Sequence, residues 1–269
     1  MYQPDAKESQ DVKWNEFTLI VPAVSVGNVG QLTADLLICT LYMNKVGYLC
    51  DDSILPMVGN DPYTTNSEGQ ICNLVTGAQV YMSASLKLIV IQQRAPFVKG
   101  KRGQFCEKLM SWIQEKQFRQ VVIVTSSHAH MRTDTQLQGS QLRYLATPEF
   151  DALTQNSVEE NLHWMRLEPS ENPLQSQDSD LYIPGGGLAK TLFSACKLSH
   201  VAAVCVLTFC AEGENAVDAI QLATFLNQYL KVADEKNQFP TPGNVGRSPW
   251  KIPISWNLLY GNSVDQMIY

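Results

Sequence analysis

Residues 17–41 read FTLIVPAVSVGNVGQLTADLLICTL, and this stretch is the strongest indication of the fold class. Residues 17–21 are apolar and rich in β-branched side chains over the length of a buried strand. A glycine-bearing turn follows at residues 25–30, and residues 32–41 carry the wide apolar face of a core helix. A strand that leads through a short turn into such a helix is typical of an α/β domain, where ligands bind at these turns.

The turn from Ser25 to Gly30 contains signals for a helix start. Asn28 is a favourable N-cap residue, and Gln31 follows it at the spacing of a capping box. Backbone N–H groups at a helix N-terminus can also bind an anion. The GxGxxG fingerprint of dinucleotide binding is incomplete, however, because Gly27 and Gly30 have no third glycine after them. We interpret the turn as a capped connection, with anion binding as the alternative.

The rest of the chain alternates between buried strands and amphipathic helices. The sequence QVVIVT at residues 120–125 is expected to form a fully buried strand, and apolar residues recur at helical spacing over residues 104–116. The further expected strands are 47–50, 55–58, 79–83, 86–92, 181–183 and 201–209, and the further expected helices are 151–161, 187–196 and 215–231. This alternation predicts an α/β fold, a three-layer α/β/α sandwich with a mixed sheet.

The pattern also predicts the organisation of the chain. We expect one α/β core domain at residues 15–233, because strands and helices alternate along it and a single α/β sandwich of this size is ordinary. Residues 1–14 are polar and are expected to form a flexible arm. Residues 234–269 are punctuated by proline yet carry two tryptophans, so we expect an extended segment that packs on the core or on a partner.

Composition excludes several classes of protein. The formal net charge of −6 argues against a nucleic-acid partner, whose phosphates require a basic patch. No apolar run approaches the roughly 18–20 residues of a membrane span, and the N-terminus lacks the apolar region of a signal peptide. Seven cysteines occur without a CxxC, several of them inside apolar runs, as in core cysteines of a reducing compartment. We expect a soluble protein of the cytoplasm and nucleus, with no membrane partner.

Two further motifs resemble parts of active sites. Residues 183–191, IPGGGLAKT, look like a phosphate loop, but Ala189 stands before Lys190 where the Walker pattern requires glycine. We interpret these glycines as places of close strand–helix packing. Ser126 and His128 follow a buried strand, where α/β enzymes keep catalytic groups, but no GxSxG elbow surrounds the serine. A nucleoside phosphorylase or hydrolase that uses this loop and the turn from Ser25 to Gly30 is the alternative function.

The sequence gives no reason to expect a metal or a cofactor. Asp51, Asp52 and Asp61 could bind Mg²⁺ weakly, but turn capping is the ordinary role of such residues. The four histidines have no zinc-ligand spacing with any cysteine. We therefore predict neither catalytic residues nor a bound cofactor.

Seven segments in one order carry a resemblance that spans nearly the whole chain. They are PAVSVGNVGQL, GYLCDDSILPMVGNDPY, FCEKLMSWI, VTSSH, RYLATP, IPGGGLAKTL and RSPWKIPISWNLLYG. In these segments the chain resembles the PAC2 family of proteasome assembly chaperones. The resemblance implies a nucleoside-phosphorylase-like sandwich and a non-enzymatic chaperone. It further implies a heterodimer with a sister chaperone, proteasome assembly chaperone 1, that guides assembly of the α-subunit ring of the 20S proteasome.

The resemblance also directs attention to the C-terminal residues Met267, Ile268 and Tyr269. Tails in proteasome assembly often end in a hydrophobic residue, a tyrosine and any final residue, and they insert between α-subunits. Here Tyr269 is the last residue, so the terminal carboxylate is one residue closer to the tyrosine side chain than that pattern requires. We expect these three residues to bind a partner, and an unbound tail is the alternative. The sequence leaves open which face forms the heterodimer and which α-subunits are contacted.

Overall fold

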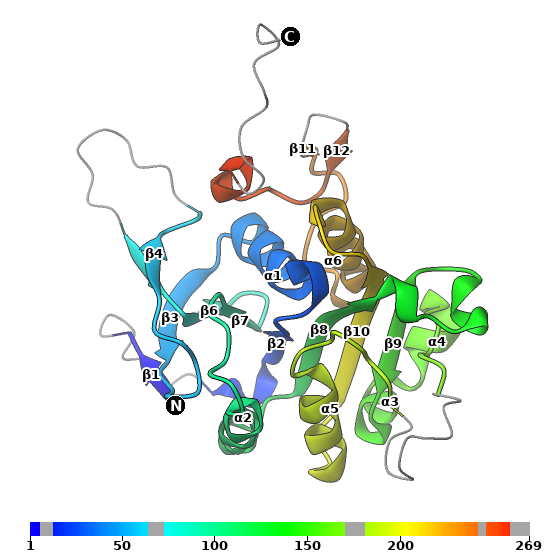
Figure 1. The fold of residues 1–269 in the computed structure, drawn as a ribbon, viewed down its shortest axis with the longest axis horizontal. Coiled ribbons are helices and arrows are strands. Elements are labelled where there is room, and N and C mark those ends of the chain that lie inside the picture. The colour runs from blue at the N-terminus through cyan, green and yellow to red at the C-terminus, as the bar shows by residue number, and fades with distance from the viewer. Residues whose placement is uncertain (6–12, 64–72, 170–180, 242–245, 259–269) are drawn as a thin grey trace, which may run out of the picture.

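The structure, a computed structural model, describes residues 1–5, 13–63, 73–169, 181–241 and 246–258. Its centre is an eight-stranded mixed sheet (Figure 1). In spatial order the strands are β1 (Tyr2–Pro4), β3 (Asn44–Leu49), β6 (Ala78–Ser83), β7 (Leu88–Gln93), β2 (Thr18–Pro22), β8 (Gln120–His128), β10 (Ala203–Cys210) and β9 (Leu142–Ala146). The four strands β7, β2, β8 and β10 are parallel, and every other pairing in this sheet is antiparallel.

Helices cover both faces of the sheet. Helices α1 (Val29–Thr40) and α6 (Ala216–Leu230) pack on one face, and α2 (Arg102–Lys116) and α5 (Ala189–Leu198) pack on the other (Figure 1). The central strands are buried along their whole length because helices lie above and below them. This arrangement confirms the expected three-layer α/β/α sandwich with a mixed sheet.

Shorter elements complete the fold. They are the helices α3 (Pro148–Thr154) and α4 (Ser157–Leu162), the ribbons β4 (Val58–Asn60) with β5 (Leu74–Thr76) and β11 (Phe239–Pro240) with β12 (Arg247–Ser248), and the 3-10 helices η1 (Trp14–Glu16), η2 (Val26–Asn28), η3 (Ala129–Met131), η4 (Asp134–Leu137) and η6 (Ile254–Leu258). The single helix expected at residues 151–161 is wrong. Gln155 and Asn156 adopt left-handed backbone angles, which end α3 before α4 begins.

The start of α1 corrects a local prediction. Asn28 is the N-cap residue, but its backbone is left-handed with φ 55°, and its side chain makes no capping hydrogen bond. The capping box is therefore wrong, and the Gln31 amide instead donates to the carbonyl of Gln93 at 2.7 Å. Gly30 has a packing role, because a Cβ at this position would lie 2.6 Å from the carbonyl oxygen of Val124. Helix α1 can approach the sheet this closely only with glycine there.

Other corrections concern strands. The strand expected at residues 55–58 begins only at Val58, and residues 181–183 form no strand. The edge strand β9 was not expected, because it carries Arg143 as its second residue. This arginine is fully buried, and its guanidinium pairs with Glu168 at 3.2 Å and donates to the carbonyls of Ser140 and Leu142. A charged residue that is satisfied in this way can occupy a buried position in an edge strand.

The described part of the N-terminal arm is docked and not free. Tyr2–Pro4 pairs with β3 as an antiparallel edge strand. The ring of Tyr2 lies 5.5 Å from that of Trp112 and 5.2 Å from that of Trp14, which gives the strand an aromatic anchor. These contacts were not foreseen from the sequence, because the polar composition of the arm concealed its aromatic contacts. Residues 6–12 of the arm lie outside the described part of the chain.

The described part of the C-terminal segment lies against α1 and α6. Trp250 is fully buried, and its indole N–H donates to the Thr224 hydroxyl at 2.9 Å. Trp256 is buried in the same apolar cluster. The division of the chain into arm, core and C-terminal segment stays a prediction. Among the described helices, none is long and apolar enough to cross a bilayer.

Candidate functional site

The three site-like motifs of the sequence meet at the carboxyl ends of β2 and β8. Strand β2 leads into the turn of residues 25–30, and β8 ends at His128. Between them lies the segment of residues 184–187. Its Gly185 carbonyl accepts from the backbone N–H of Val26 at 3.0 Å, and its Pro184 carbonyl accepts from that of His128 at 3.0 Å. We call residues 25–30, 126–128 and 184–187 together the carboxyl-end cluster.

The hydroxyl groups in the carboxyl-end cluster bond to one another and to the backbone. Ser126 donates to the carbonyl of Val26 at 2.6 Å, which uses its only proton. The Ser25 hydroxyl, 2.7 Å from that of Ser126, must then be the donor between the two. Ser25 oxygen also accepts from the backbone N–H of Ser126 at 3.2 Å. Each serine is therefore a structural link between β2 and β8.

This bonding does not match an activated nucleophile. A nucleophilic serine needs a base within hydrogen-bond reach of its hydroxyl, and in the described residues no hydrogen bond joins Ser25 or Ser126 to a histidine. Ser126 is fully buried, and it belongs to β8 and not to the loop that the sequence suggested. The structure thus brings the two motifs of the alternative enzyme together in a different chemical role.

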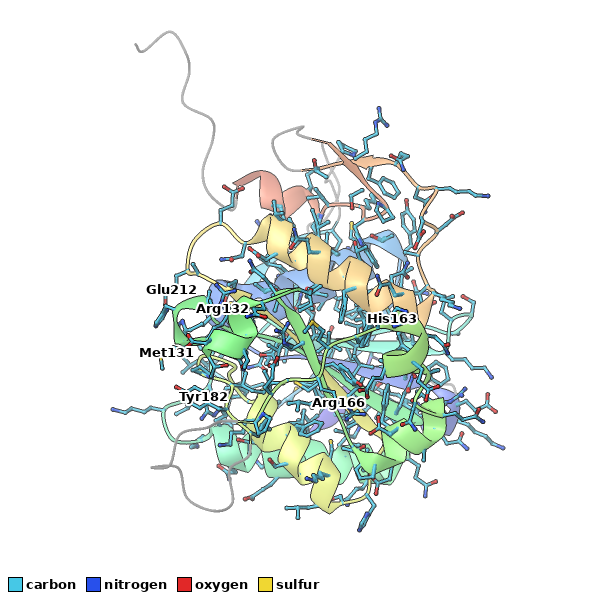
Figure 2. All side chains as sticks on the ribbon, turned by 90° about the vertical axis from the view of Figure 1, so that its right-hand side faces the viewer. Met131, Arg132, His163, Arg166, Tyr182 and Glu212 are labelled. Carbon is cyan, nitrogen blue, oxygen red and sulfur yellow. The ribbon has the colours of Figure 1, made fainter. Side chains whose placement is uncertain are left out.

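Past the end of β8, residues 128–132 are partly or fully exposed to solvent. The imidazole rings of His128 and His130 have centroids 4.9 Å apart. Figure 2 shows Met131, Arg132 and Glu212 on the same side of the molecule. The Arg132 side chain is held by the carbonyl of Ala129, which accepts from Nε at 2.9 Å. These residues present polar and apolar groups to solvent next to the carboxyl-end cluster.

We expect Ser126→Ala to lower the free energy of unfolding by about 1–3 kcal/mol. It removes the acceptor of the Ser25 hydroxyl and leaves the buried carbonyl of Val26 with only the weak thiol donor of Cys210, at 3.6 Å, among the described residues. Urea denaturation measures the change. Ser25→Ala combined with Ser126→Ala should cost less than the sum of the single changes, since both remove the same link. Strictly additive losses would contradict this account of the cluster.

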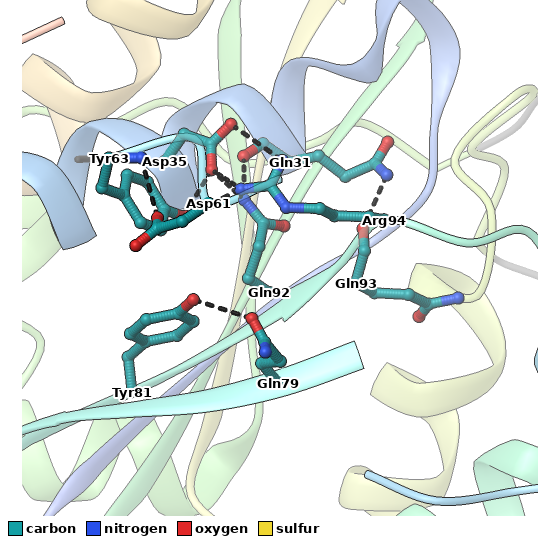
Figure 3. A network of polar contacts seen from close by, with 9 residues as sticks. All are labelled: Gln31, Asp35, Asp61, Tyr63, Gln79, Tyr81, Gln92, Gln93 and Arg94. Atoms are coloured by element: carbon teal, nitrogen blue, oxygen red, sulfur yellow. Dashed lines mark hydrogen bonds and ion pairs between the residues drawn. The ribbon is translucent and has the colours of Figure 1, made fainter. Parts of the chain in front are cut away.

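A second polar site, not foreseen from the sequence, lies between α1 and the end of β7 (Figure 3). Asp35 is buried on α1, and one of its carboxylate oxygens accepts from three donors. They are Arg94 Nη2, the Tyr63 hydroxyl and Gln92 Nε2, each at 2.6 Å. Arg94 also donates to the Tyr63 hydroxyl at 3.0 Å. We call these four residues the Asp35 network.

The Asp35 network fixes the ends of several elements. Burial, and then the nearby Asp35 carboxylate, raise the pKa of the Tyr63 hydroxyl well above its usual value, so Tyr63 is a donor at neutral pH. Gln92 Nε2 donates as well to the carbonyl of Gln31 at 2.8 Å, which joins β7 to the first turn of α1. The sequence signal is a single aspartate inside the apolar run of residues 32–41, and a buried charge there requires a partner.

The predicted carboxylate and cysteine sites take structural roles. Asp51 accepts from the backbone N–H of Ser53, and Asp61 from that of Tyr63, each at 2.9 Å, which confirms turn capping. Asp52 pairs with Lys101 and Lys108. No group of three His, Cys, Asp or Glu side chains suited to a metal is found in the described residues. Six cysteines among the described residues form no disulfide, and five of these six are buried, as expected of core residues.

The comparisons with known proteins agree with the resemblance in the sequence. A model of the PAC2 family matches residues 19–233. The chain belongs to the PAC2 family. Among its relatives, proteasome assembly chaperone 2 of Homo sapiens is 40% identical over 271 residues, with 100% of both chains covered. Proteasome assembly chaperone 2 of Danio rerio is 42% identical over 255 residues, which cover 94% of this chain and 95% of that one.

Solved structures of PAC2-like proteins share the fold. Pyrococcus furiosus PbaA, an archaeal homolog of proteasome-assembly chaperone, matches with a TM-score of 0.59 and 15% identity over 81% of this chain and 82% of its own. PbaB, an archaeal proteasome activator from the same organism, matches with a TM-score of 0.58 and 15% identity over 86% and 89%. At these identities the likeness concerns the fold alone. The expected partner-binding residues Met267, Ile268 and Tyr269 lie outside the described residues.

Proposed function

We propose that this chain is a non-enzymatic chaperone for assembly of the α-subunit ring of the 20S proteasome. The observation that carries the proposal is the 40% identity to human proteasome assembly chaperone 2 along the full length of both chains. The chain acts as one half of a heterodimer with proteasome assembly chaperone 1, in the cytoplasm and the nucleus. Its other partners are the α-subunits.

The mechanism of such a chaperone is differential binding. The heterodimer holds free α-subunits in ring geometry and covers a surface that would otherwise associate wrongly. No covalent step and no nucleotide is required. In support, the serine protons of the carboxyl-end cluster are bound to other groups of the protein, so the cluster offers no prepared nucleophile.

Affinity purification of the tagged full-length chain from cell lysate, followed by mass spectrometry, tests the proposal. We expect α-subunits together with one sister chaperone in equal amount. The variant His128→Ala removes the imidazole of the alternative enzyme and should recover the same partners. Phosphate and nucleosides should leave the melting temperature unchanged, since a ligand of the folded state would raise it. Recovery without α-subunits would contradict the chaperone. Loss of them in a normally folded His128→Ala variant would show that the loop after β8 takes part in binding.

We expect removal of Met267, Ile268 and Tyr269 to weaken binding to the α-ring several-fold and to leave the heterodimer intact. Burial of an Ile and a Tyr side chain contributes roughly 1.5–3 kcal/mol each. Ordering the tail costs on the order of 1–2 kcal/mol per residue, so the net gain is small. Titration of labelled chaperone with α-ring, by anisotropy, measures the change.

A glycine extension of the tail is the matched test of the carboxylate. It keeps the side chains of Ile268 and Tyr269 but moves the terminal charge, which removes any charge-assisted bond to the ring. We expect the extension to weaken binding as the deletion does. If only the deletion has an effect, the side chains alone make the contact. If neither has an effect, the tail does not bind the ring.

A further inference from the structure

Two histidines, His128 and His130, lie side by side at the carboxyl end of β8. The centroids of their imidazole rings are 4.9 Å apart, and the ring planes are tilted by 47°. Neighbouring aromatic rings prefer stacked or perpendicular arrangements, and this tilt is neither. Among the described residues, no hydrogen bond or ion pair engages either imidazole, whereas the ring of His200 pairs with Glu149 at 2.7 Å. The ring nitrogens of this pair are therefore open to a ligand.

The backbone holds the pair in place. His128 is the last residue of β8, where it is opposite Cys210 of β10, and its N–H donates to the carbonyl of Pro184 at 3.0 Å. A Cβ on Gly185 would lie 2.8 Å from Cδ2 of His128, so this imidazole packs directly on the glycine backbone. His128 is half-buried and His130 is exposed. One ring is thus positioned by packing, and the other faces solvent beside it.

The separation of the two rings suits a single metal ion. An imidazole nitrogen binds a zinc ion at roughly 2.0–2.1 Å, which places the ion about 3.2 Å from the ring centroid. With an angle of roughly 90–109° at the ion, the two centroids are about 4.5–5.2 Å apart. The observed 4.9 Å lies within this interval. The exposed ring of His130 can turn a nitrogen toward the ion by side-chain rotation alone.

The surroundings favour a transition-metal ion with water in its remaining positions. Imidazole suits zinc, copper and nickel, whereas magnesium and calcium prefer oxygen ligands. The described residues offer no group of three metal-binding side chains, so two imidazoles leave coordination positions open. The nearby cation Arg132 is engaged elsewhere: its Nε donates to the carbonyl of Ala129 at 2.9 Å, and its guanidinium lies 5.8 Å from the ring of Phe209.

We propose that His128 and His130 chelate one divalent transition-metal ion, such as Zn²⁺, at the surface beyond β8. One nitrogen of each imidazole binds the ion, and water fills the other positions. Because these positions are open, the ion is an exchangeable ligand of the surface and not a structural centre of the fold. The proposal concerns the chemistry of this histidine pair and does not depend on a role in proteasome assembly.

The test uses the untagged full-length chain with ¹⁵N-labelled histidine, titrated with zinc chloride at neutral pH and followed by NMR of the imidazole nitrogens. We expect the resonances of His128 and His130, assigned with the single alanine variants, to shift together along one saturable curve. The exposed His163, at the end of α4, is the internal control and should not move. No saturable shift, separate curves for the pair, or an equal shift of His163 overturns the proposal.

Two variants and a competing ion make the test specific. His130→Ala removes one exposed ligand and should weaken zinc binding about tenfold or more, because the second arm of a chelate binds at a high effective concentration. His163→Ala removes an exposed histidine outside the pair and should leave the affinity unchanged. Equal affinities of His130→Ala and the parent overturn the chelate. Displacement of zinc by magnesium in about hundredfold excess overturns the transition-metal assignment.

Discussion

Asp35→Ala should lower the free energy of unfolding by about 3–5 kcal/mol, the cost of removing one partner from a buried ion pair. The carboxylate of Asp35 accepts from Arg94, Tyr63 and Gln92, all at 2.6 Å. Without it, the guanidinium of Arg94 keeps a single hydrogen bond among the described residues, to the hydroxyl of Tyr63 at 3.0 Å. A cation is then left largely buried without an opposite charge. Chemical denaturation measures the loss.

Asp52→Ala is the matched control. It removes the same charge from a residue that pairs with Lys101 at 2.9 Å and Lys108 at 3.0 Å, but on the surface. Exposed pairs contribute about 0–1 kcal/mol, so this variant should remain close to the parent. The double variant Asp35→Leu with Arg94→Met should regain most of the loss, because it leaves no unpaired charge. Equal effects of Asp35→Ala and Asp52→Ala would contradict the importance of burial.

Local patterns were sufficient to predict most of the layers of the fold. The apolar run before the turn of residues 25–30 became β2, and the helical spacing after it became α1. The two runs at residues 79–83 and 86–92 formed the β6–β7 hairpin. These elements could be predicted because each carries its period within a few neighbouring residues. Strands β1 and β9 could not, since distant partners stabilise them: the ring of Trp112 and the carboxylate of Glu168.

The candidate sites could be predicted only in part. Placing the turn from Ser25 to Gly30 and the motif from Ser126 to His128 in one site follows from the rule that parallel strands end at a common edge, and the structure brings them together. The hydrogen bonding of the Ser25 and Ser126 hydroxyls, in contrast, depends on a contact between residues 101 apart in sequence. The Asp35 network likewise joins residues 59 apart in its salt bridge. No local pattern records such pairs.

Gly187→Ala should be comparably severe, with a loss of about 2–5 kcal/mol. The backbone of Gly187 is left-handed with φ 62°, which costs an alanine roughly 1–2 kcal/mol. A Cβ there would also lie 2.2 Å from the carbonyl oxygen of Val24, a main-chain atom that cannot swing aside. Relieving such overpacking costs typically 1–3 kcal/mol more. The same denaturation experiment measures the sum.

Gly103→Ala separates this packing effect from the general effect of replacing a glycine. Gly103 lies in the first turn of α2, and a Cβ there would meet nothing within 4 Å. Alanine favours helix over glycine by about 1 kcal/mol, so this variant should be as stable as the parent or slightly more stable. If Gly187→Ala were equally harmless, residues 184–187 could relax away from β2. The three glycines of IPGGGLAKT would then need another explanation than close packing against the residues that follow β2 and β8.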